Sequence, residues 1–224
     1  MKEICSLVLA NVKEFFAQYP EIETSDHGFD HACRVLNKAR KIVSMSKANG
    51  IEDIDEDVAY LAAILHDVDD HKYFGTSDYA NARRIMKECN VDADTIEKVV
   101  NCINQVGFSK NKFNPTDCIE AGIARDADRL DASGAFGVMR TFIYGASVGR
   151  PVEESIKHFS DKILHLHKHM CTDAGKELAK IIGKHSENFM MDLGMEYALS
   201  DGIKCYGEDP IEVADNLIKR YARR

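Results

Sequence analysis

The sequence has few of the residues that break helices or cross-link a chain. It contains only four prolines, and its seven cysteines include no C-x-x-C pair. An odd number of cysteines without a paired framework indicates reduced thiols, which excludes a disulfide scaffold. Asp or Lys interrupts every long apolar stretch, so we expect no membrane span. What remains is the composition of an ordinary globular protein.

The chain also lacks a surplus of positive charge. Its 29 Lys and Arg residues are outnumbered by 37 Asp and Glu residues, which gives a net charge of −8. Broad nucleic-acid binding needs a basic surface, so we expect no stable nucleic-acid partner. A small anionic substrate remains compatible with this charge, because a bound cation can reverse the local field. Residues 1–3 lack the basic start of a secretory signal, and we therefore expect a cytoplasmic protein.

Few segments alternate like strands, and apolar residues instead recur at helical spacing. Ser25-Asp26 offers an N-cap for a helix that ends at Asn49-Gly50, and residues 58–66 are apolar nearly all round, as in a buried central helix. The pattern predicts an all-α protein. Further helices are expected over residues 7–16, 81–89, 95–104, 118–132, 156–168, 173–182 and 186–193.

Residues 145–151, Gly-Ala-Ser-Val-Gly-Arg-Pro, form the one plausible linker in the chain. The sequence therefore predicts a helical metal-binding core over residues 1–145 and a C-terminal helical extension over residues 146–224 that packs on it. The apolar helices of this extension could form the surface of a homodimer.

A run of acidic residues follows the central apolar helix. His66 and Asp67 are adjacent, and Asp69 and Asp70 come directly after them. Burying such groups without partners costs several kcal/mol, so they need partners or a metal ion. Imidazole and carboxylate are good ligands for divalent cations. Because adjacent helical residues point about 100° apart, other helices must supply further ligands.

Two segments can supply those ligands. His31 begins a helix and precedes an apolar stripe, and residues 125–131 carry three aspartates. At helical spacing Asp128 faces small neighbours that leave room for an ion, and we prefer it as the ligand. Asp126 falls on a different face, nearer an arginine, and is assigned to charge pairing. Asp126 and Asp131 remain alternative ligands.

This arrangement resembles the HD phosphohydrolase superfamily, whose pattern is H…HD…D on separate helices around one metal. The matching residues here are His31, His66-Asp67 and Asp128. The similarity extends over most of residues 20–195. It implies an all-α HD-domain bundle with a C-terminal extension, and a single divalent ion from among manganese, cobalt, nickel, magnesium and iron. Further segments that resemble small stand-alone bacterial HD hydrolases are His27–His31 with Arg34-Val35, 123–137 and 158–164.

Some HD proteins carry additional histidines and assemble two metals. Where many relatives would have one of these histidines this chain has Val106, and His71 is not favoured as a ligand, so we expect one ion. The segment 165–169 contains three histidines, but only His165 and His169 share a helical face. We therefore expect an exposed helix face there and no second metal site.

The resemblance implies a role for Asp70 in positioning or deprotonating the attacking water. Asp70 lies one helical turn beyond His66, although Asp69 and Asp70 could instead be solvated or pair with Lys72. Such an ion can polarise a phosphoryl oxygen and lower the pKa of a bound water. Asp70 is accordingly the predicted catalytic residue.

Three further residues complete the predicted site. Arg34 and Lys162 could hold a substrate phosphate, the first as a planar fork and the second as a point charge. Asp131 is grouped with them as a residue that could orient a ligand from behind.

The sequence as a whole predicts a metal-dependent phosphohydrolase that cleaves a phosphate ester or anhydride. A nucleotide substrate follows from the resemblance alone, since fold does not fix substrate. The alternatives are an iron-dependent oxygenase or lyase with the same ligand set, and a non-catalytic sensor that binds nucleotide and metal.

Overall fold

The computed structural model describes residues 3–24, 27–112 and 114–199, and every regular element within them is helical. This confirms the all-α prediction. The elements are α1 (Glu3–Phe16), α2 (Pro20–Thr24), α3 (Phe29–Ala48), α4 (Glu56–Leu65), α5 (Ala80–Glu88), α6 (Ala93–Asn104), α7 (Phe108–Asn111), α8 (Ile119–Asp131), α9 (Gly134–Ser147), α10 (Val152–His158), the π-helical turn η1 (Phe159–Ile163), α11 (Leu164–Leu166), the 3₁₀ turn η2 (His167–His169) and α12 (Asp173–Leu199).

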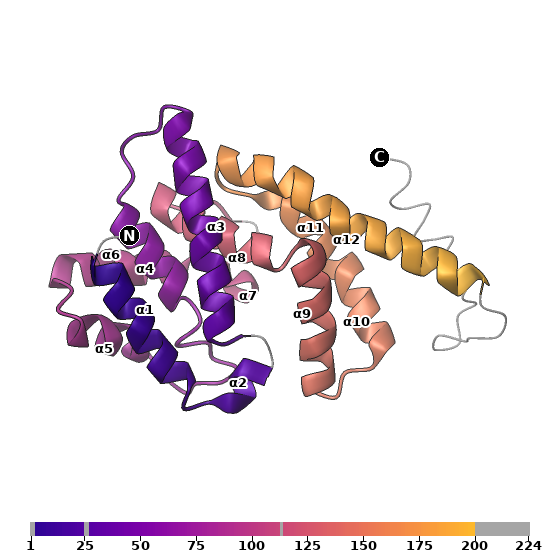
Figure 1. Cartoon of the computed structure of the whole chain (residues 1–224), viewed down its shortest axis with the longest axis horizontal. Coiled ribbons are helices and arrows are strands. Elements are labelled where there is room, and N and C mark those ends of the chain that lie inside the picture. The colour runs from indigo at the N-terminus through magenta and orange to yellow at the C-terminus, as the bar shows by residue number, and fades with distance from the viewer. Residues whose placement is uncertain (1–2, 25–26, 113, 200–224) are drawn as a thin grey trace.

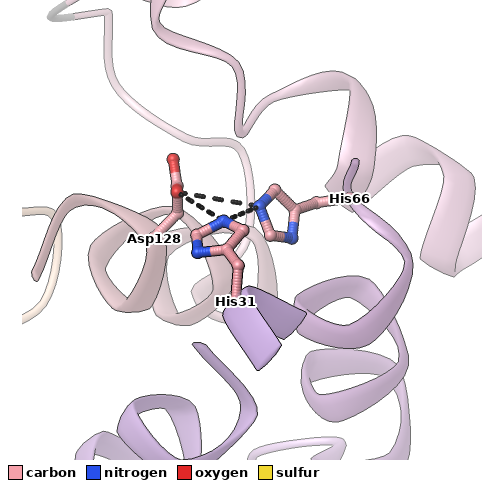
Figure 2. A group of neighbouring side chains, drawn as sticks. All are labelled: His31, His66 and Asp128. Atoms are coloured by element: carbon pink, nitrogen blue, oxygen red, sulfur yellow. Dashed lines mark hydrogen bonds and ion pairs between the residues drawn. The ribbon is translucent and has the colours of Figure 1, made fainter. Parts of the chain in front are cut away.

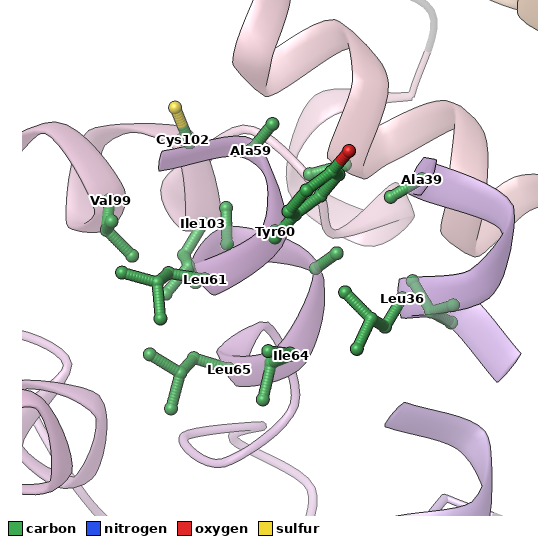
Figure 3. Close-up of a cluster of buried hydrophobic side chains, with 14 of the residues drawn as sticks. Leu36, Ala39, Ala59, Tyr60, Leu61, Ile64, Leu65, Val99, Cys102 and Ile103 are labelled. Atoms are coloured by element: carbon green, nitrogen blue, oxygen red, sulfur yellow. The ribbon is translucent and has the colours of Figure 1, made fainter. Parts of the chain in front are cut away.

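Helix α4 is the centre of the main core. Every residue from Val58 to Leu65 is buried, as the all-apolar sequence predicted. Figure 3 shows α4 between Leu36 of α3 on one side and Val99 of α6 on the other. The helix begins at a fixed point, because the Asp55 side chain accepts a hydrogen bond from the Val58 backbone N–H at 3.2 Å.

Helices α3 and α8 pack on α4 and on each other. Ala121, Ala124 and Ala127 of α8 are fully buried, and such small side chains allow close helix packing. This packing brings the start of α3, the residues after α4 and the last turns of α8 to one place. Three segments that are distant in sequence therefore meet at one end of the core.

The C-terminal helices form a second layer beside this core (Figure 1). Helix α12 runs along it and packs on α8 and α9. A small second core holds the layer together, and it consists of Phe159, Ile163, Leu164, Leu166 and Met190.

The second layer differs from the sequence prediction in its helix boundaries. α12 is one helix where two were predicted, because Gly183 does not end it. A Cβ at Gly183 would lie 3.2 Å from His167, so this glycine permits a close approach to η2. The predicted single helix 156–168 is divided among α10, η1, α11 and η2.

Two further sequence predictions concern segment ends. Residues 145–147 form the last turn of α9, so the expected linker reduces to residues 148–151, and the domain division at residue 145 stays a prediction. The predicted cap Ser25-Asp26 and the last part of the extension, residues 200–224, lie outside the described residues.

None of the described helices combines the length and the apolar character that a membrane crossing requires. The homodimer surface expected from the extension stays a prediction.

Candidate metal centre and its cavity

Three potential metal ligands converge from three segments. One donor atom from each of His31, His66 and Asp128 lies within 4.8 Å of the other two (Figure 2). The Nε2 atoms of His31 and His66 are 3.2 Å apart, and Oδ1 of Asp128 lies 3.5 and 3.6 Å from them. Two imidazole nitrogens and a carboxylate oxygen facing one point are a ligand set for a divalent cation.

Asp67 borders the same point. Its Oδ2 atom lies 3.4 Å from Nε2 of His31, and its Oδ1 atom lies 3.4 Å from Nε2 of His66. The structure therefore brings together all four residues that the sequence predicted as ligands. Within the described residues no other group of three His, Cys, Asp or Glu side chains offers a comparable site, and the segment 165–169 is not one.

The hydrogen bonds behind the two histidines determine which ring nitrogen faces the site. Nδ1 of His66 lies 2.9 Å from the carbonyl oxygen of Ala63, and Nδ1 of His31 lies 2.8 Å from Oδ2 of Asp131. Both partners are acceptors, so each Nδ1 carries the proton. Each Nε2 faces the centre and offers its lone pair once it has lost its own proton, as metal ligation requires.

The close contacts couple the protonation of these groups. Burial raises the pKa of Asp67 and of Asp128, but the neighbouring histidines outweigh it and hold both pKa values well below the usual range. Burial and Arg140 lower the pKa of His31, yet its hydrogen bonds to three carboxylates raise it to about 10. Cation binding at these histidines must therefore compete with protons.

Asp131 lies behind His31 and forms hydrogen bonds with several side chains. Its side chain is fully buried, and its Oδ1 atom accepts hydrogen bonds from Nε of Arg34 at 3.1 Å and Nζ of Lys38 at 2.6 Å. Burial raises the pKa of Asp131, but His31 and the surrounding cations hold it well below its usual value. Arg34 and Asp131 do not line the cavity beside the centre. For Arg34 this placement favours supporting His31 through Asp131 over the substrate contact suggested by the sequence, and Asp131 lies behind His31 as the sequence suggested.

A cavity of about 880 Å³ opens beside the ligand cluster. The part of its lining here called the metal side consists of His66, Asp67 and Asp128. Five cations also line the cavity, and Tyr79, Phe108 and Tyr144 contribute aromatic surface. These cations, here called the cationic wall, are Lys72, Lys110, Arg140, Arg150 and Lys162.

Lys162 reaches this cavity from the π-helical turn η1. Its Nζ atom lies 4.8 Å from the centre of the Phe108 ring, within range of a cation–π interaction. Burial lowers the pKa of Lys162, and the neighbouring Lys72 and Arg140 act in the same direction against Asp128. The side chain thus stands where the resemblance placed it, at the cavity.

Asp70 also lines the cavity, but not for the reason that the sequence suggested. Helix α4 ends at Leu65, and residues 66–69 form a turn, so Asp70 is not on a continuing helix. Its Oδ1 atom accepts the Lys72 backbone N–H at 3.0 Å, and its Oδ2 atom lies 3.5 Å from the Lys72 Nζ. Asp70 is therefore both at the cavity and paired with Lys72.

Two nearby aspartates accept hydrogen bonds from backbone N–H groups and, among the described residues, serve neither as metal ligands nor in ion pairs. Asp126 was assigned to charge pairing, but it accepts the backbone N–H groups of Cys171 at 2.7 Å and Thr172 at 2.8 Å, just before α12. Asp69 accepts the backbone N–H groups of Asn81 at 3.0 Å and Ala82 at 2.9 Å at the start of α5.

Sequence reasoning missed two residues beside the centre. Nδ1 of His27 lies 3.6 Å from Oδ2 of Asp67, and Arg140 contacts both His27 and Asp131. His27 is part of the His27–His31 segment that resembles HD hydrolases, which was a usable signal. Nothing in the sequence marks Arg140, because a helix break separates it from the ligand-bearing helix.

Sequence comparisons identify relatives of this chain. Residues 28–133 match the HD domain family. The chain is 30% identical over 178 residues to the uncharacterized protein YpgQ of Bacillus subtilis, covering 75% of this chain and 82% of that protein. It is 29% identical over 163 residues to the uncharacterized protein L803 of Acanthamoeba polyphaga mimivirus, covering 66% of this chain and 64% of that one.

Solved structures share the fold beyond the matched segment. Bacillus subtilis YpgQ in complex with ADP superposes with a TM-score of 0.69 at 25% identity, over 89% of this chain and 100% of that one. An HD-superfamily hydrolase from Bacillus thuringiensis superposes with a TM-score of 0.66 at 28% identity, over 88% and 97%. Coverage of this extent includes C-terminal helices beyond residue 133, which are therefore part of the shared architecture.

Proposed function

This chain belongs to the HD-domain family, and from that premise we propose that it hydrolyses a phosphate ester or anhydride of a nucleotide, using one divalent ion held by His31, His66, Asp67 and Asp128. The observation that carries the proposal is the convergence of these ligands at a cavity that is also lined by cations. A metal ion and a polyanion are both attracted to such a site.

The residues fit a divalent ion. The two histidines each present an Nε2 lone pair, and two carboxylates balance the ion's charge. When bound, the ion would polarise a phosphoryl oxygen and lower the pKa of a water molecule. This mixed nitrogen and oxygen ligand set is compatible with manganese, as it is with the other candidate ions, and we would test manganese first.

Side chains of the protein would accept the proton of the water and bind the phosphate. Asp70, which lines the cavity, would accept a proton from the attacking water. Lys162 and Arg150 would hold phosphate oxygens and orient them toward the metal side. Lys72 lies beside Asp70, with its Nζ atom 3.5 Å from Oδ2.

The size and the walls of the cavity support a nucleotide over a simple phosphate ester. A cavity of about 880 Å³ falls within the range of cofactor-sized sites. Tyr79, Phe108 and Tyr144 offer aromatic surface on which a base could stack. The related YpgQ structure contains ADP, which makes nucleoside phosphates the first class to test.

The test is release of phosphate and pyrophosphate by metal-stripped protein. The protein is reloaded separately with manganese, cobalt, nickel, magnesium or iron and offered ADP, nucleoside and deoxynucleoside triphosphates, and p-nitrophenyl phosphate. We expect metal-dependent release from the nucleotides and none from an Asp67→Ala variant. Absence of release from every substrate by protein with a bound ion would refute the proposal and favour a sensor or an oxygenase.

A further inference from the structure

A tight reversal of the chain between α8 and α9 places Arg140 next to the ligand cluster. It lies nine residues after Asp131, on the helix that follows the ligand-bearing α8. Gly134 adopts a φ of +67°, and a Cβ at Gly137 would lie 2.3 Å from the carbonyl oxygen of Ala132. These two glycines let α9 begin directly against the end of α8, which directs Arg140 toward the centre.

The guanidinium group of Arg140 contacts two residues at once. Its NH1 atom lies 3.0 Å from Oδ2 of Asp131, the same oxygen that receives the Nδ1 proton of His31. Its NH2 atom lies 3.2 Å from Nδ1 of His27, whose ring in turn lies beside Asp67. One planar group therefore spans the supports of two candidate ligands, His31 and Asp67.

These contacts orient both partners of Arg140. A guanidinium group only donates, and its NH2 atom holds the His27 ring next to Asp67. On the other side, Arg140 orients the Asp131 carboxylate so that Oδ2 receives the His31 Nδ1 proton and Nε2 of His31 faces the ligand cluster.

Charge alone does not account for Arg140. Arg34 and Lys38 already bind the other oxygen of Asp131, so its negative charge is balanced without a third cation. What only Arg140 supplies is a fixed fork between Asp131 and His27. A lysine at this position carries the same charge but offers a single point of contact.

We propose that Arg140 is a positioning residue of the metal centre, which fixes His31 through Asp131 and holds the His27 ring beside Asp67. This inference rests on the proposed metal site. It assigns a function in metal binding to a helix that lies outside the segment 28–133 matched by the HD domain.

The test is titration of the metal-stripped protein with Mn²⁺, followed by calorimetry, with KM and kcat measured in parallel on the same samples. Arg140→Gln should weaken Mn²⁺ binding by about 10- to 100-fold, the usual effect of losing a group behind a metal ligand. Arg140→Lys should recover little of that affinity. Thermal unfolding would reveal a variant that has not folded. If Arg140→Gln does not fold, the Mn²⁺ affinity of Arg140→Lys, which keeps the charge, is compared with that of the wild type.

Arg150→Gln is the matched control. Arg150 lines the same cavity, but it stacks on Tyr144, with its guanidinium carbon 5.3 Å from the ring centre. This variant should raise KM and leave Mn²⁺ affinity unchanged. The inference is overturned if Arg140→Gln binds Mn²⁺ like the wild type and raises only KM, or if Arg140→Lys restores full affinity. A wild-type protein that binds no Mn²⁺ would instead overturn the proposed metal site itself.

Discussion

The ligand cluster and the cationic wall are built differently and come largely from different parts of the chain. In the ligand cluster, His31 and the Asp131 behind it are almost fully buried and joined by a hydrogen bond of 2.8 Å. On the cationic wall, Lys162 and Arg150 rest on the faces of aromatic rings. A ring face restrains a cation less than a hydrogen-bonded carboxylate does, so we infer a rigid metal side and an adaptable substrate side.

The origin of the two sides in the sequence matches this difference. All the candidate ligands lie within residues 28–133, the segment that matches the HD domain. Three of the five cations of the wall lie beyond residue 133. The family segment would therefore supply the reactive centre, while the C-terminal helices would select the substrate. The predictions below separate these two contributions.

The largest effect is expected on the metal side. Asp128→Asn removes one of the two carboxylates that would balance the ion's charge. We expect loss of Mn²⁺ binding and a fall in kcat/KM on the order of 1,000-fold or more, since the ion supplies several kcal/mol of transition-state stabilisation. Metal analysis and steady-state kinetics measure both quantities.

Asp126→Asn is the control for that variant, because Asp126 holds the backbone of Cys171 and Thr172 and not the cluster. It should retain Mn²⁺ and most of the activity. Equal loss of metal from both variants would contradict the assignment of Asp128 as a ligand.

The next effect is expected on the cationic wall. Lys162→Met keeps the aliphatic stem on Phe108 but removes the charge that faces the cavity. KM for the nucleotide should rise about 10- to 100-fold, the size expected for losing one charged hydrogen bond, while Mn²⁺ affinity stays unchanged. Lys157→Met, on an exposed position of α10, should leave both unchanged. A fall in metal affinity for Lys162→Met would contradict the inference that metal binding and substrate binding depend on separate sets of residues.

The sequence was sufficient for the parts of the site that depend on local pattern. The apolar run before His66 predicted the buried α4, and the helical spacing correctly placed Asp128 in the ligand cluster and Asp126 away from it. What Asp126 does instead depends on the backbone of residues 171–172, which no local pattern indicates.

The parts that sequence could not supply depend on tertiary contacts. In the sequence Gly183 suggests the end of a helix. In the structure the helix continues through it, and the missing side chain lets α12 approach His167 closely. Asp70 was placed by helical periodicity, although the helix had already ended at Leu65. Arg140 reaches the centre only because two glycines fold α9 back against α8.

A smaller effect is expected at the contact between the two regions. Asp126→Ala leaves two backbone N–H groups at the start of α12 without their acceptor. Because buried unpaired donors are costly, the free energy of unfolding should fall by about 1–3 kcal/mol. Urea unfolding measures this loss. An unchanged midpoint would show that this contact does not anchor the C-terminal helices.

The smallest effect is a pH dependence from the cationic wall. Burial and the nearby Lys162 and Arg150 lower the pKa of His158 to about 4, so His158 is neutral at pH 7 in the folded protein. Between its usual value of 6.5 and about 4 the unfolded chain binds more protons at this residue than the folded chain. Stability should therefore fall as pH decreases through that window.

His158→Gln should reduce this loss of stability, as measured by the difference in thermal midpoint between pH 7 and pH 4.5. His185→Gln, at an exposed position of α12, is the matched control. An identical acid sensitivity in wild type and His158→Gln would remove His158 from the account.

The most direct test of the central claim is the position of the metal itself. Crystals of Mn²⁺-loaded protein, measured at the manganese absorption edge, give an anomalous difference map that locates each ion without reference to activity. We predict one peak, bounded by Nε2 of His31 and His66 and by the carboxylates of Asp67 and Asp128. Two adjacent peaks, or a peak only at the segment 165–169, would contradict the single-ion centre on which the proposed hydrolysis rests.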